Sequence, residues 1–390
     1  MSRDLILLAC ALMTWGLGEG MFYFFQPLYL QELGADPLKV GSILGLIGLA
    51  MTLSYLPAGV LSDRFGRRPL LLWAWIIGTL ATVVMAVAPS LPLLVVGMVL
   101  YGSTNFVTVP LYSYVTAARG RLNVGRVLTL VSVFFNLGFI VGPLLGGFLG
   151  ERFGLQTNFR FAALIFIAST AILVFIHPQP VEKPIGDTPT PGLRTLWQES
   201  YGRYILLIFF ITFGMYLPQP LSQNYLQNEK GVGLVAIGQL LSVRSTGIVV
   251  LNLILGHLNA RLGYLLSQVG MVFATLFIWL GSGFPAYMAG YLLMGSYITG
   301  RGLAIAQGRV LVQAANMGRA YGMLETAMAS AMVLGPPLAG LLYEINPDLI
   351  YITGLVLIAA GLAANLIFSP LRQKDLVKFE EGEKARWTHS

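Results

Sequence analysis

Four charged residues lie inside long apolar stretches of this sequence, and they are the first places to look for chemistry. They are Glu19, Arg244, Arg301 and Glu325. A charge at the middle of a bilayer costs about 2.5–3.5 kcal/mol on insertion scales, so it usually has a partner or a task. A carboxyl group there can bind and release a proton, and a guanidinium can hold a carboxylate or phosphate with two hydrogen bonds. We therefore take Glu19 and Glu325 as candidate proton-binding residues and the two arginines as candidate anion-binding residues.

Only two of the four charged residues are expected to form a salt bridge with each other. Arg301 and Glu325 fall on neighbouring apolar stretches, and we expect a salt bridge between them. Arg244 is then left without an acidic partner in its own half of the chain. Because an unpaired buried guanidinium is too costly to keep for packing alone, it needs another partner. Either Glu19 pairs with it from the other half, or the acid group of a bound molecule does.

Polar side chains near these charges are candidates for lining a cavity. One stretch contains Ser103, Thr104, Asn105, Thr108, Tyr112 and Ser113, and another contains Tyr216, Gln219, Gln223 and Asn224. We expect those that contact a bound molecule to be Asn105, Thr108, Tyr112, Tyr216 and Gln219, together with Arg244 and Arg301. The aromatic residues of the first stretch are expected mainly to pack against other helices, with a few facing the cavity. These are Trp15, Phe22, Tyr23, Phe24 and Phe25.

The composition excludes several classes of protein. With 56% hydrophobic and 11% charged residues, the chain is too apolar for a soluble protein, in which about a quarter of the residues are charged. The basic residues lie mostly in short segments between apolar stretches, which indicates membrane topology rather than nucleic-acid binding. A single cysteine, Cys10, excludes an internal disulfide and most metal sites. No phosphate-binding loop occurs, and the three histidines accompany no nucleophile or metal set, so we expect no enzyme, cofactor or metal.

The apolar stretches predict an all-α membrane protein with twelve spanning helices. The first stretch is too long for the apolar part of a signal peptide, so we expect it to remain as a span. The predicted spans are 5–33, 38–62, 69–89, 91–118, 123–150, 158–178, 202–228, 232–258, 262–283, 285–313, 318–344 and 348–370.

The distribution of basic residues predicts the orientation of these spans. One set of ends and loops carries most of them, whereas the opposite loops carry only Lys39, Arg152, Arg160 and Lys230. Because cytoplasmic loops are enriched in Lys and Arg, both termini are predicted to be cytoplasmic. The proline-rich residues 179–200 are then a cytoplasmic linker, and the charged residues 371–390 are a cytoplasmic tail.

The short segment between the second and third predicted spans carries the most specific motif. It reads Gly-Val-Leu-Ser-Asp-Arg-Phe-Gly-Arg-Arg-Pro, residues 59–69, and suits a tight hairpin at the cytoplasmic surface. The segment resembles the signature between the second and third helices of the major facilitator superfamily. The match, which we take as a gating motif, lies at Gly59, Asp63, Arg64, Gly66, Arg67 and Arg68. We expect Asp63 to lie near the start of the eleventh span, Met317–Gly318, where the helix dipole favours an anion.

The two halves of the chain repeat at an offset of 193 residues. Gly142-Pro143 recurs as Gly335-Pro336, for example. The fifth span also resembles a motif of the drug:proton antiporters in the same superfamily, although Met98 stands where that group has an arginine in its fourth helix. We expect the small residues of this motif to form a contact surface between the halves. They are Gly138, Gly142, Pro143, Gly146 and Gly147.

The resemblance covers nearly the whole chain and implies two pseudo-symmetric six-helix bundles, residues 1–178 and 201–370. It implies a central cavity that opens alternately to each side of the membrane. The implied function is secondary active transport of a small organic solute, coupled to protons through Glu19, by a monomer in a bacterial inner membrane. The alternatives left open are efflux of lipophilic drugs by proton antiport, a lipid flippase, and a membrane sensor that transports nothing.

Overall fold

The computed structural model describes residues 3–119, 124–179, 199–308, 311 and 317–368. Within these ranges the secondary structure is helical, without strands. Ten helical stretches there are long and apolar enough to cross a membrane. Two further crossings consist of shorter helices, so the twelve crossings expected from the sequence are present.

The helices fall into two groups of six crossings. The first group consists of α1 (Arg3–Phe22), η1 (Tyr23–Phe25), α2 (Gln26–Glu32), α3 (Pro37–Phe65), α4 (Arg67–Val87), α5 (Leu91–Ser103), η2 (Thr104–Val107), α6 (Thr108–Ala118), α7 (Val124–Phe153) and α8 (Gln156–Val174). The second consists of α9 (Glu199–Tyr216), α10 (Ser222–Asn228), α11 (Leu234–Gly256), α12 (Ala260–Trp279), α13 (Phe284–Met294), α14 (Ser296–Gly308), α15 (Met317–Ile345) and α16 (Leu349–Phe368).

Four crossings that the sequence analysis treated as continuous helices are broken. They are the first, fourth, seventh and tenth: α1–η1–α2, α5–η2–α6, α9–α10 and α13–α14. Proline explains three of the breaks, because it lacks a backbone N–H and crowds the preceding turn. Pro27, Pro110 and Pro218 lie at or just after them, and Gly295 lies at the fourth. A break at membrane depth is tolerated where the backbone faces protein or a cavity, which is where these four crossings lie.

The connection between α3 and α4 is the predicted hairpin. Gly66 adopts a φ of 83°, a left-handed conformation that glycine takes without strain, and it is the N-cap of α4. The side chains of residues 56–64 and 312–320 lie outside the described part of the structure. The expected contact of Asp63 with Met317–Gly318 therefore stays a prediction, as do the roles of Gly59 and Arg64.

Two arginines make the internal repeat visible in the contacts. Arg68 Nε donates to the Ile176 carbonyl at 2.6 Å, and its Nη2 donates to the Val174 carbonyl at 3.0 Å, both at the end of the first group. Arg261 lies 193 residues after Arg68, which is the offset of the repeat. Its Nη2 donates to the Leu366 carbonyl at 3.3 Å, near the end of α16. Each arginine thus satisfies carbonyls that the last turn of a helix leaves unpaired.

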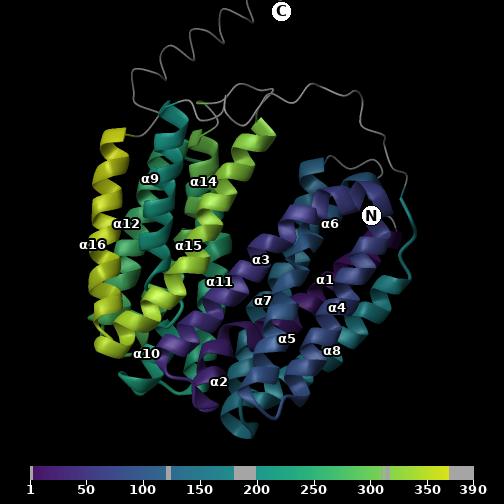
Figure 1. Cartoon of the computed structure of the whole chain (residues 1–390), viewed down its shortest axis with the longest axis horizontal. Coiled ribbons are helices and arrows are strands. Elements are labelled where there is room, and N and C mark those ends of the chain that lie inside the picture. The colour runs from purple at the N-terminus through teal and green to yellow at the C-terminus, as the bar shows by residue number, and fades with distance from the viewer. Residues whose placement is uncertain (1–2, 120–123, 180–198, 309–310, 312–316, 369–390) are drawn as a thin grey trace, which may run out of the picture.

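The two groups form bundles that meet along two helix pairs, α3 with α15 and α7 with α11. At Gly41 and Gly45 of α3, an added Cβ would overlap backbone atoms of α15, so the absence of a side chain permits close contact. Figure 1 shows that α1 begins and α16 ends on one face of the molecule, whereas α2 and α10 lie on the opposite face. The ribbons of the two bundles diverge toward the first of these faces.

The small residues of α7 point in two directions. Gly138, Gly142 and Gly146 lie against α1 of the same bundle, where a Cβ would overlap main-chain atoms. Gly147 lies against α11 of the other bundle, and Pro143 lies against both helices, with its carbonyl beside Gly238 of α11 and its ring beside Gly20 of α1. The expectation that the whole motif forms a surface between the halves was therefore wrong for three of its five residues. Residues four apart share one face of a helix, so those three glycines face the same neighbour.

Candidate functional site

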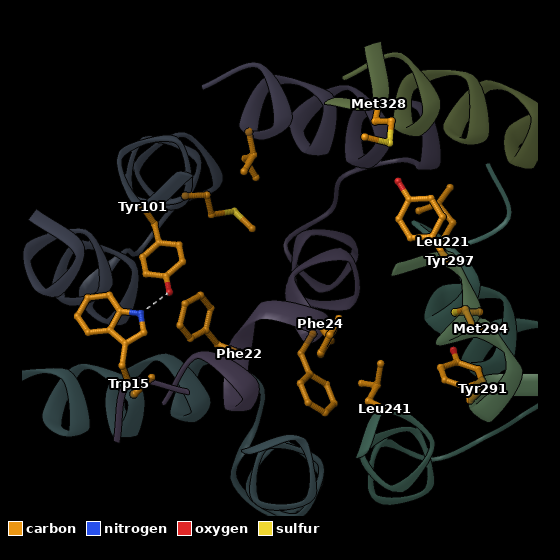
Figure 2. Packing of buried hydrophobic residues seen from close by; sticks show 14 of the residues in the cluster. Trp15, Phe22, Phe24, Tyr101, Leu221, Leu241, Tyr291, Met294, Tyr297 and Met328 are labelled. Carbon is orange, nitrogen blue, oxygen red and sulfur yellow. Dashed lines mark hydrogen bonds between the residues drawn. The ribbon is translucent and has the colours of Figure 1, made fainter. Parts of the chain in front are cut away.

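A cavity of about 250 Å³ lies inside the first bundle, between α1, α4, α6 and α7, and we call it the first-bundle cavity. Five aromatic side chains contribute to its wall: Trp15, Trp75, Tyr101, Tyr112 and Phe135. Trp15 Nε1 donates to the Tyr101 hydroxyl at 3.2 Å (Figure 2), and the Trp15 ring stacks on Phe166 with centroids 3.9 Å apart. Gly78 leaves room for the indole, because a Cβ there would overlap it. These contacts hold the wall in one arrangement.

Glu19 lines the first-bundle cavity, half-buried, with its carboxyl group close to the Tyr101 hydroxyl. Its neighbours Gly16 and Gly20 touch the backbone of α7, which fixes the rotation of α1. No Lys or Arg lines this cavity, and the ion pairs within the described ranges do not include Glu19. Glu19 is therefore a carboxyl on the wall of an internal cavity with no cationic partner among the described residues.

A second cavity of about 230 Å³, the central cavity, lies between the two bundles. Arg244 on α11 lines it, and its Nη2 donates to Gln219 Oε1 at 2.8 Å. The guanidinium lies over the Phe24 ring, 5.1 Å from the centroid. Its Nε is buried and has no hydrogen-bond partner within the described ranges. Figure 2 shows Phe24 between the Trp15 side of the molecule and the side that carries Tyr297.

Arg301 also lines the central cavity, but its charge is matched. Its Nη2 donates to Glu325 Oε2 at 2.7 Å, which confirms the salt bridge expected from the sequence. The side chains are 23% and 50% exposed, so the pair lies at the edge of the interior. Glu325, the second candidate for proton binding, is not among the residues that line either cavity.

The two cavities adjoin along two helices. Glu19 lines one cavity, and Tyr23, about one turn later, lines the other; Phe135 and Phe139 of α7 do the same. Four residues of helix rise about 6 Å, so a solute of modest size can reach both. Tyr23 lies within electrostatic reach of both Glu19 and Arg244.

Each residue that the sequence analysis selected for contact with a bound molecule lines one of these cavities. Asn105, Thr108 and Tyr112 line the first-bundle cavity, and Tyr216, Gln219, Arg244 and Arg301 line the central cavity. Among the aromatic residues of the first crossing, Trp15, Tyr23 and Phe24 line a cavity, whereas Phe22 and Phe25 are buried in packing. Of the other polar candidates, Thr104 and Gln223 line a cavity, whereas Ser103, Ser113 and Asn224 line neither. A place on a cavity wall does not show a role in binding, so these roles stay predictions.

The sequence analysis missed Gln26 and Tyr297, which also line the central cavity. A signal for the first existed: Gln26-Pro27 recurs as Gln219-Pro220 at the same offset of 193 residues. Both glutamines lie at a helix break, one in each bundle, and both line the central cavity. Tyr297 follows the break at the start of α14, and no pattern in the sequence distinguishes it from the other tyrosines.

Hydrogen bonds between the bundles gather on the face formed by α2 and α10 (Figure 1). Asn224 Nδ2 donates to Gln31 Oε1 at 2.6 Å, and Gln31 Nε2 donates to Asn228 Oδ1 at 3.1 Å. Nearby, Glu151 at the end of α7 accepts a hydrogen bond from the Val235 backbone N–H at 2.8 Å. These contacts close the space between the bundles on this face.

Comparison with known proteins gives the family. The model described as the Major Facilitator Superfamily matches residues 8–314 and 204–389. An uncharacterized MFS-type transporter of Methanocaldococcus jannaschii is 30% identical over 160 residues, which cover 41% of this chain and 42% of that protein. Multidrug resistance protein 2 of Bacillus subtilis is 20% identical over 369 residues, which cover 90% of this chain and 92% of that protein.

The fold is also found among solved structures. The crystal structure of the nucleoside transporter NupG superposes with a TM-score of 0.76 at 12% identity, covering 94% of this chain and 98% of that one. At this identity the likeness concerns the fold alone. The family model, however, matches most of the sequence, and the helices form the two bundles that the hairpin motif and the repeat predicted. This multi-pass membrane protein belongs to the Major Facilitator Superfamily.

Proposed function

We propose that this protein is a secondary active transporter that moves a small organic solute by alternating access and couples its movement to protons through Glu19. The observation that supports the coupling is a carboxyl group that lines a cavity and has no cation beside it within the described ranges. Such a group can take up a proton from one side of the membrane and release it to the other as access to the cavity changes. The substrate contacts the residues that line the two adjoining cavities.

The arrangement of charges along the chain supports an orientation. With the termini and the linker at residues 179–200 in the cytoplasm, the α2–α10 face is the outer face. The contacts between the bundles on that face then support an inward-open state. The transporter acts as a monomer in a bacterial inner membrane. In the outward-open state the hairpin at residues 59–69 moves against the start of α15 and holds the cytoplasmic side closed.

The test begins with a thermal-shift screen of the purified protein against metabolites and drugs, followed by uptake of the best ligand into proteoliposomes. With an imposed pH gradient the wild type accumulates the ligand. Glu19→Gln mimics the protonated side chain, so it loses accumulation while exchange of ligand across the membrane partly survives. Glu344→Gln, which neutralises an exposed carboxyl at the end of α15, retains both activities. If Glu19→Gln still concentrates the ligand, the coupling site lies elsewhere.

Efflux of lipophilic compounds by proton antiport is the second candidate, and two observations favour it. The first-bundle cavity is lined by the rings of Trp15, Trp75 and Phe135 beside Glu19. Multidrug resistance protein 2, named for resistance, aligns with 90% of the chain. Proton-driven export of ethidium from loaded vesicles, lost in Glu19→Gln, is the result that selects this candidate over uptake of a polar solute.

A further inference from the structure

We propose that the solute is an organic anion, whose carboxylate or phosphate pairs with Arg244 in the central cavity and whose apolar body extends into the first-bundle cavity. This inference deepens the proposed transport function and rests on it in one respect, namely that the bound anion is the molecule transported. The binding site itself is argued from the contacts of Arg244, and it holds whether or not protons drive the transport.

The charge of Arg244 is unmatched among the described residues. Its contacts are the neutral oxygen of Gln219 and the ring face of Phe24. No Asp or Glu lines the central cavity, and neither ion pair between described residues includes Arg244. The first alternative from the sequence, a pair between Arg244 and Glu19, is absent in this state. Since a guanidinium inside a membrane protein is costly to leave alone, an anionic ligand is its natural partner.

Two neighbouring side chains hold the Arg244 guanidinium in place before any ligand binds. Gln219 accepts a hydrogen bond from one terminal nitrogen at 2.8 Å, and the Phe24 ring lies under the guanidinium, 5.1 Å from ring centroid to Cζ. Because the guanidinium is held before binding, less side-chain entropy is lost when a carboxylate forms two hydrogen bonds with it. The hydroxyl-bearing side chains of Tyr216 and Tyr297 line the same cavity and offer further donors to an anion.

Arg301 provides an internal comparison within the same cavity. Glu325 already neutralises it through a hydrogen bond of 2.7 Å, so Arg301 adds little net charge for a ligand. The net positive charge of the central cavity therefore comes from Arg244. Removal of Arg244 abolishes recognition of the acid group, whereas removal of Arg301 and Glu325 together weakens it much less.

The first-bundle cavity suits the rest of the molecule. Its lining includes aromatic rings, which suit an apolar, flat body, and the polar side chains of Asn105 and Thr108, which can form hydrogen bonds. The cavities adjoin at Glu19 and Tyr23, about 6 Å apart along the helix axis, a length that a small aromatic acid can bridge. The chemical class is therefore a carboxylic acid or phosphate monoester with an aromatic or other flat apolar body.

The experiment measures binding to the purified full chain, without a proton gradient, by thermal unfolding followed by light scattering. The probes are benzoate, indole-3-acetate and phenyl phosphate, each beside its uncharged or amine counterpart: benzamide, indole-3-acetamide, tryptamine and phenol. We expect at least one acid to stabilise the wild type and its counterparts to fail. The affinity for that acid falls at least tenfold in Arg244→Gln and less in Arg244→Lys, because Lys keeps the charge and loses the fork. Arg160→Gln, a change on an exposed end of α8, leaves the affinity unchanged.

Three results would each overturn the proposal. They are stabilisation by the amine or neutral compounds instead of the acids, stabilisation by none of the compounds, and an acid affinity that is unchanged in Arg244→Gln. Should Arg244→Gln fail to fold, Gln219→Met replaces it, since that change removes only the hydrogen bond that supports the guanidinium. It is expected to weaken acid binding severalfold. If acids bind through Arg244 while Glu19→Gln still accumulates them, the coupling proposal fails and this one stands.

Discussion

Glu151 on α7 forms a hydrogen bond with α11 of the other bundle, on the α2–α10 face. We expect its removal to make this face open more often. The first residues of α11 have free backbone N–H groups, and the N-cap residue, Gly233, supplies no side-chain cap. Glu151 Oε2 from α7 accepts from the Val235 N–H at 2.8 Å instead. A hydrogen bond to a charged group contributes about 1.5–3 kcal/mol, and an anion at a helix N-terminus about 0.3–1 kcal/mol when exposed. Because Glu151 is exposed, we expect Glu151→Ala to weaken closure by about 1–2 kcal/mol, a factor of about 5–30 in population.

The assay is the rate at which a membrane-impermeant maleimide labels Ala35→Cys from the outer side, in a Cys10→Ser background. Ala35 is 4% exposed and lies between the bundles near Gln31, so labelling requires this face to open. Glu151→Ala raises the rate about 5–30-fold, and Glu151→Gln, which keeps an acceptor and loses the charge, raises it less. Glu344→Gln is the control, an exposed carboxyl on the same face. Unchanged rates in both Glu151 variants would refute the argument that this carboxylate holds the face closed.

Three further substitutions, the first with a matched control, test two other contacts and the assignment of the proton-coupling residue. Gly41→Val places a branched side chain against the backbone of α15, so it should raise labelling of the same reporter cysteine and slow transport, whereas Gly302→Ala, which has open space, should change neither. Arg68→Ala removes hydrogen bonds of 2.6 and 3.0 Å to the end of α8, and we expect a loss of about 1–3 kcal/mol, seen as a lower thermal unfolding temperature with cavity binding intact. Glu325→Gln should retain pH-driven accumulation in proteoliposomes; loss of accumulation there, with Glu19→Gln active, would move the coupling site.

The sequence predicted the twelve crossings and several polar residues of the cavity walls, because charged and polar groups are costly in a membrane. The charged groups of Arg301 and Glu325 need either each other or water as partners in a membrane, and they form a salt bridge. Polar residues such as Asn105 and Gln219 avoid the lipid and line the cavities. A single physical constraint therefore predicted both a salt bridge and a set of polar and charged residues on the cavity walls. The apolar stretches gave the number of helices, and the repeat at 193 residues gave their grouping into two halves.

The details that the sequence did not reveal depend on which surfaces meet. The sequence does not show which neighbouring helix each small residue of α7 contacts. Gly142 faces α1 and Gly147 faces α11, because the two residues lie on different sides of one helix. Residues near the ends of helices posed a similar difficulty. Gln31, Asn224 and Glu151 lie close to the ends of predicted spans, and the sequence does not show that they form contacts between the two bundles.

The central claim is that access to the cavities alternates between the two sides of the membrane, and cysteine labelling at Thr108 tests it most directly. Thr108 lines the first-bundle cavity. In the Cys10→Ser background, Thr108→Cys is exposed to an impermeant maleimide in right-side-out and in inverted vesicles. Alternating access predicts labelling from both sides, with the outer-side rate increased by Glu151→Ala and the cytoplasmic-side rate decreased. Labelling from one side only, with rates unaffected by Glu151→Ala, would contradict it.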